Sequence, residues 1–81
     1  MPTIDLVLEH RAAADSLFEE GSRRFDSDPS GAKFFLNLAG RVYDKIGDRF
    51  YRGLTRGWYT ATLSALREMP SDDSAAWYNK R

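Results

Sequence analysis

Residues 35–56 read FLNLAGRVYDKIGDRFYRGLTR, and two stripes of side chains run through this stretch at helical spacing. Cations that recur every three or four positions share one face of a helix, because each residue turns the helix by about 100°. They are Arg41, Lys45, Arg49, Arg52 and Arg56. A nearly opposite apolar stripe is typical of a helix face packed against a core. It contains Phe35, Ala39, Val42, Ile46, Phe50 and Leu54. The stretch therefore predicts one helix with a buried apolar face and an exposed basic face.

A second helical pattern precedes this stretch, with seam residues alternately three and four positions apart. A strand cannot produce such spacing, so we expect a helix over residues 4–25. The seam consists of Ile4, Val7, Arg11, Ala14, Phe18, Gly21 and Phe25. Between the two patterns, Asp28 and Pro29 are typical of an N-cap followed by the first helical position. We therefore expect the next helix over residues 29–52, packed on the first as an antiparallel hairpin.

The apolar stripe falters after Leu54, and Gly53 and Gly57 bracket the change. One interpretation places a turn at these glycines before a third helix over residues 58–69, and this is the one we adopt. The other interpretation places both glycines inside a helix, at a point where a neighbour approaches closely.

Pro70 is expected to end the third helix. The tail over residues 70–81 then either docks through Trp77 and Tyr78 or frays. The predicted fold is all-α, a small helical hairpin or three-helix domain with a short C-terminal tail, and residues 1–81 form a single domain.

Composition narrows the classes of function. The 81 residues include 12 Lys plus Arg and 12 Asp plus Glu, so no net charge draws the whole molecule to nucleic acid or to an anionic membrane. The absence of cysteine excludes disulfides and thiolate metal sites. The N-terminus lacks the pattern of a signal peptide, and no apolar run approaches the roughly 18 residues of a membrane span. We expect a cytoplasmic protein without a membrane partner.

Few side chains suit catalysis. His10 is the only histidine and has no Ser or Cys nucleophile motif beside it, so we expect an incidental surface position. Two carboxylate pairs have a spacing that suits a hard cation, but such pairs are more typical of solvated helix faces. They are Asp15 with Glu19, and Asp44 with Asp48. No glycine-rich phosphate loop or Gly-x-Ser-x-Gly elbow occurs. We therefore expect neither an enzyme nor a metal or cofactor.

The basic stripe is the strongest functional signal. Four of its five cations are arginines, whose planar guanidinium groups suit carboxylates. Asp44 and Asp48 border the stripe, so an exposed face laced with internal salt bridges is the competing interpretation. The leading hypothesis is a regulator, adaptor or inhibitor that docks an acidic surface of another protein. The predicted partner-binding residues are Arg41, Lys45, Arg49, Arg52, Arg56, Trp58 and Tyr59, of which the two aromatic residues serve as apolar anchors.

Two other functions fit the same pattern. Residues 49–68 admit a helix-turn-helix interpretation with Gly57 in the turn, in which the second helix reads a major groove of DNA. The DNA-binding residues are then Thr60, Thr62, Ser64 and Arg67. Arg56 weakens this interpretation, because it occupies a position that normally faces the core. The third hypothesis is a structural protein that assembles into homo-oligomers, since so small a domain buries a limited core.

Overall fold

Every regular element in the described part of the chain is helical, which confirms the predicted all-α class. The structure, a computed structural model, describes the backbone of residues 3–80 and the side chains of residues 9–80. The elements are α1 (Thr3–Arg23), α2 (Pro29–Lys45), α3 (Arg49–Leu66), the 3-10 turn η1 (Asp72–Ser74) and α4 (Ala75–Tyr78). None of the helices over these residues is both long enough and apolar enough to cross a membrane.

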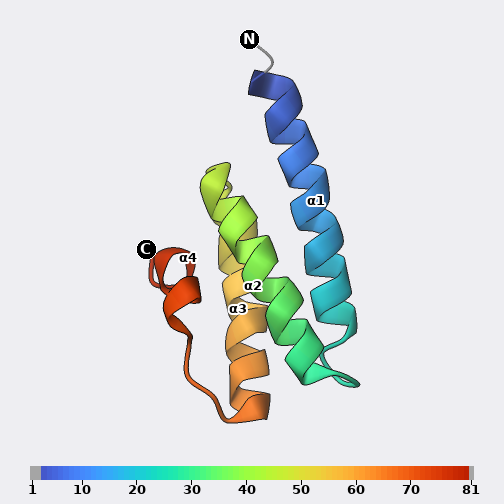
Figure 1. Cartoon of the computed structure of the whole chain (residues 1–81), viewed down its shortest axis with the longest axis vertical. Coiled ribbons are helices and arrows are strands. Elements are labelled where there is room, and N and C mark those ends of the chain that lie inside the picture. The colour runs from blue at the N-terminus through green and yellow to red at the C-terminus, as the bar shows by residue number, and fades with distance from the viewer. Residues whose placement is uncertain (1–2, 81) are drawn as a thin grey trace.

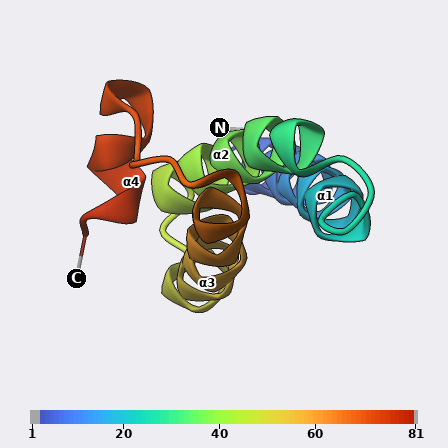
Figure 2. The ribbon, with the colours of Figure 1, turned by 90° about the horizontal axis from the view of Figure 1, so that it is seen from below.

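The central helix is α2, and α1 and α3 each run antiparallel along it (Figure 1). Figure 2 shows that α3 stands out from α2, with α1 on one side and α4 on the other. The start of α2 is as the sequence predicts. Pro29 is its first residue, and the Asp28 side chain accepts a hydrogen bond from the Gly31 N–H over 3.1 Å.

The end of α2 differs from the prediction, because the helix stops at Lys45 rather than near residue 52. Gly47 has a φ of +77°, a left-handed conformation that glycine adopts without a steric penalty, and the chain reverses there. Asp48 then caps α3 by accepting a hydrogen bond from a backbone N–H in its first turn over 2.9 Å.

The third helix also begins earlier than predicted. Because α3 runs without interruption from Arg49 to Leu66, the predicted turn at Gly53 and Gly57 and the predicted helix over residues 58–69 are wrong. Both glycines lie inside α3. No atom of a described neighbour lies within 4 Å of where a Cβ would stand at either of them.

The reversal at Gly47 divides both sequence stripes between two helices. Of the predicted core residues, Ala39 is buried on α2, and Val42 and Ile46 pack partly buried beside it. Phe50 and Leu54 lie on α3 instead and are 72% and 42% exposed. The prediction that these two residues face the core is therefore wrong.

Two clusters form the core. The first joins α1 to α2 and contains Ala14, Ala39 and Tyr43. Two further seam residues of the predicted first helix, Phe18 and Phe25, are partly buried, whereas the side chains of Ile4 and Val7 lie outside the described residues. The second cluster joins α2, α3 and α4 and contains Ala32, Leu36, Tyr59, Leu63 and Trp77.

The C-terminal tail docks on the body of the molecule through Trp77, which is the first of the two predicted alternatives. Trp77 is 1% exposed, and its indole N–H donates a hydrogen bond to Asn37 Oδ1 over 2.8 Å. Gly40 makes room for the indole, because a Cβ at this position would overlap the ring. The tail therefore completes the second core cluster.

Candidate protein-docking face

The side of α3 that points away from α2 is exposed along the helix. Six of its exposed residues fall within an arc of roughly 100°, at about 100° per residue. They are Phe50, Gly53, Leu54, Gly57, Ala61 and Ser64, and we call them the α3 outward face. Phe50 and Leu54 supply its large apolar groups, and Gly53 and Gly57 carry no side chain beside them.

The opposite side of α3 is already used, because it packs on α2. There Tyr59 and Leu63 are buried together with two threonines, Thr55 and Thr62. The threonine hydroxyls donate to backbone carbonyl oxygens four residues earlier, over 2.7 Å and 2.8 Å, so their burial leaves no donor unpaired. A helix that buries two threonines while it exposes a phenylalanine and a leucine departs from the usual pattern, in which the large apolar side chains lie on the packed face.

Aromatic contacts with α1 and with the turn that follows it border one edge of the outward face. The ring centroids of Tyr51 and Phe18 lie 6.4 Å apart, and those of Trp58 and Phe25 lie 5.7 Å apart, both in edge-to-face geometry. Trp58 still has 36% of its surface exposed. This predicted anchor therefore remains accessible to a partner at the edge of the face.

Tyr59 does not share this accessibility. It is fully buried, and its ring packs against those of Trp77 and Tyr78. Its assignment as an exposed anchor is therefore wrong, and the reason is that the tail covers it.

The alternative DNA-binding residues are also not presented together. Thr62 is buried, and the Thr60 hydroxyl is engaged with the Arg56 carbonyl oxygen over 2.8 Å and with the Tyr78 hydroxyl over 2.7 Å. Ser64 and Arg67 are exposed. Since α3 is continuous across Gly57, residues 49–68 do not form the two helices that a helix-turn-helix requires.

Three of the five predicted cations are engaged within the molecule. The side chain of Arg52 is 13% exposed and donates to Asp44 Oδ1 over 3.1 Å. Arg56 donates to the Tyr78 carbonyl oxygen over 2.6 Å, and its guanidinium carbon lies 4.5 Å from the centroid of the Tyr78 ring. Arg41 lies 3.9 Å from a tail carboxylate and is the most loosely held of the three.

The other two cations, Lys45 and Arg49, are exposed. Among the described side chains neither of them forms an ion pair, and the same holds for Arg67. Arg49 lies on the edge of the outward face opposite Trp58, at about 100° per residue, and Arg67 follows directly after the last residue of α3. The face therefore has an apolar centre with a basic edge.

Acidic residues near α3 are neutralised internally. Asp48 pairs with Arg11 of α1. Burial raises the pKa of Asp44, but hydrogen bonds from Lys80 and Arg52 outweigh it and hold the pKa below its ordinary value. These acids are therefore not free to pair with the exposed Arg49 and Arg67. The surface around α3 consequently carries an excess of positive charge.

The sequence contains a signal for the boundary between α2 and α3, and an interpretation based on the spacing of apolar residues alone overlooks it. Glycine often ends a helix, and aspartate often caps the start of the next one. Gly47 followed by Asp48 therefore indicates a boundary between two helices. With the boundary there, Phe50 and Leu54 fall on a separate helix.

The described residues bring together no group of three or more side chains of the types that bind metal ions. Comparisons of the chain with known protein families, with curated proteins and with solved structures found no match.

Proposed function

We propose that this chain is a non-catalytic interaction protein that docks an apolar, acidic-edged helix of a partner protein through the α3 outward face. The observation that supports this most is the exposure of Phe50 and Leu54 on a helix whose other side buries threonines. Covering apolar surface contributes about 25 cal/mol per Å², so these side chains favour association. Gly53 and Gly57 offer no side chain to keep a partner helix at a distance.

The charge around the face favours an acidic partner over a second copy of the chain. A copy placed antiparallel about Gly57 would set Arg49 beside Ala65, two residues from the unpaired Arg67. Like charges would then meet at both ends of the contact, which costs free energy. An acidic edge on a different protein would instead pair with these cations and would speed the encounter.

The test compares proteins captured from a lysate by four forms of the immobilised chain: wild type, Phe50→Ser, Arg49→Glu and Phe34→Ser. Phe34 provides the matched control, because it is 60% exposed but lies on α2. We expect Phe50→Ser to weaken capture by about tenfold or more, since it removes a central apolar group. Arg49→Glu should weaken capture severalfold, and more at low than at high salt.

A partner that is captured equally by Phe50→Ser and Phe34→Ser would contradict the proposal. Two further measurements separate the alternatives. Duplex DNA that binds tightly at low salt and weakens steeply as salt rises would favour nucleic-acid binding. A mass that grows with protein concentration in light scattering, and that Phe50→Ser abolishes, would favour self-assembly.

A further inference from the structure

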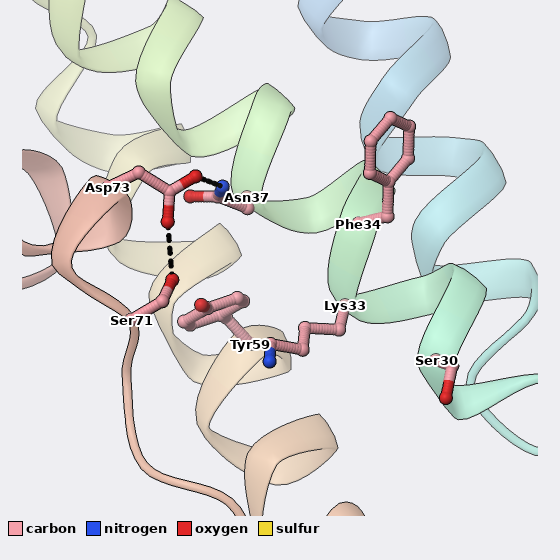
Figure 3. Close-up of a pocket in the computed structure, with 7 residues that line it drawn as sticks. All are labelled: Ser30, Lys33, Phe34, Asn37, Tyr59, Ser71 and Asp73. Carbon is pink, nitrogen blue, oxygen red and sulfur yellow. Dashed lines mark hydrogen bonds between the residues drawn. The ribbon is translucent and has the colours of Figure 1, made fainter.

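A pocket of about 310 Å³ opens between α2, α3 and the segment that leads into η1 (Figure 3). It lies on the side of α3 opposite the outward face, because α3 lines it with Tyr59. One face of α2 lines it with Lys33, Phe34 and Asn37, and the tail contributes Asp73. Figure 3 shows the Lys33 and Tyr59 side chains extending into the space between α2 and the tail.

The Tyr59 hydroxyl is the unusual group in this pocket. The residue is fully buried, and its hydroxyl has no hydrogen-bond partner in the described part of the chain. Buried polar groups are normally paired, because losing water without a replacement partner is costly. Edge-to-face contacts with Trp77 and Tyr78, at centroid distances of 5.2 Å and 5.4 Å, fix the ring in place. Because Tyr59 lines the pocket, an acceptor atom bound there would supply the partner that this hydroxyl lacks.

The hydrogen-bonding capacity that remains in the pocket is mostly of the donor kind. Besides the Tyr59 O–H, the Lys33 ammonium has three N–H groups, of which one reaches Glu68 Oε1 over 2.5 Å. Asp73, in contrast, already accepts hydrogen bonds from Asn37 over 3.0 Å and from a tail serine over 2.5 Å. Unused donors beside a carboxylate that already accepts two hydrogen bonds favour a ligand that brings acceptor oxygens.

We propose that this pocket binds a small aromatic carboxylate, whose oxygen accepts hydrogen bonds from the Tyr59 hydroxyl and the Lys33 ammonium and whose ring rests on Phe34. The volume is at the lower end of the range for small-molecule sites, so it suits a single ring. Phe34 is 60% exposed and offers an apolar surface for that ring. The site does not depend on the α3 outward face.

The test titrates the full chain with benzoate, benzamide and benzylamine, which share a ring and differ in charge, and follows the amide resonances by NMR. We expect benzoate to shift the resonances of Lys33, Asn37 and Tyr59, benzamide to shift them less, and benzylamine to leave them unchanged. Tyr59→Phe removes only the hydroxyl, so benzoate affinity should fall about tenfold while the melting temperature stays equal or rises. Lys33→Met should weaken benzoate binding similarly, and Phe50→Ser on the opposite side should not.

Three results would overturn the proposal. In the first, none of the probes perturbs the pocket. In the second, benzylamine binds best. In the third, Tyr59→Phe lowers the melting temperature and leaves benzoate affinity unchanged, which would mean that water alone satisfies the hydroxyl. Should Tyr59→Phe fail to fold, unchanged benzoate affinity in Lys33→Met would overturn it as well.

Discussion

Asp48 links three helices through one carboxylate. It follows the turn that ends α2, it caps α3 by accepting a hydrogen bond from the Tyr51 N–H, and it pairs with Arg11 of α1. Burial raises its pKa, but the hydrogen bonds from Tyr51 and Arg11 outweigh burial and hold the pKa below its ordinary value. The folded chain therefore favours the charged form of Asp48.

The sign of this shift predicts how stability depends on pH. Because the pKa of Asp48 is lower in the folded than in the unfolded chain, its charge stabilises the fold above a pH of about 4, and the contribution is lost as the pH falls further. Asp48→Asn keeps a capping oxygen but removes the charge. We expect it to lower the free energy of unfolding by about 1–2 kcal/mol at pH 7.

Urea denaturation of both proteins at pH 7 and at pH 3 measures this effect. The difference in the free energy of unfolding between them should shrink at pH 3, because the unfolded wild-type chain then takes up a proton at Asp48 and part of the advantage of the charged form is lost. An equal difference at both pH values would show that the charge of Asp48 has no part in stability.

At the scale of the elements, glycines occupy opposite environments. Gly53→Ala should raise the free energy of unfolding by about 0.5–1 kcal/mol, because the residue is helical and open space lies beside it. Gly40→Ala should lower it by about 1–3 kcal/mol, because the added methyl group overlaps the Trp77 ring. Thermal melts followed by circular dichroism compare the two. Stabilisation by both substitutions would show that the indole does not pack on Gly40.

Local signals in the sequence were sufficient to predict much of α1 and the start of α2. The seam of the first helix and the Asp28 cap depend on neighbouring residues only, so they can be read without the tertiary structure. The α2 to α3 boundary was missed for a geometric reason. The spacing of four residues from Val42 through Ile46 and Phe50 to Leu54 continues across the boundary, so the apolar pattern shows no break there.

The candidate site was predicted less well than the fold, because exposure depends on contacts between distant segments. Trp58 is accessible as predicted, but Tyr59 is covered by a tail whose docking depends on Trp77 and Gly40. Phe50 and Leu54 have the spacing of core residues and become exposed only because α3 turns its other side to α2. No pattern within α3 itself reveals that choice.

At the scale of the whole molecule, the tail acts as a further layer over α2 and α3. The molecule extends 44 × 25 × 18 Å, and so thin a body depends strongly on each buried aromatic residue. Trp77→Ala should lower the free energy of unfolding by about 3–5 kcal/mol, since it leaves a cavity beside Gly40 and removes the bond to Asn37. A loss below about 1 kcal/mol in urea denaturation would mean that the tail contributes little to the fold.

Site-specific cross-linking tests most directly whether the α3 outward face is where a partner docks. The chain contains no cysteine, so Leu54→Cys and Phe34→Cys can each carry a single photoreactive label. In lysate, the label at residue 54 should cross-link to a partner with an acidic-edged helix, and adding Arg49→Glu should reduce the yield severalfold. The label at residue 34 should give no such product. Equal products from both positions, or a cross-link from residue 54 only to another copy of the chain, would contradict the account.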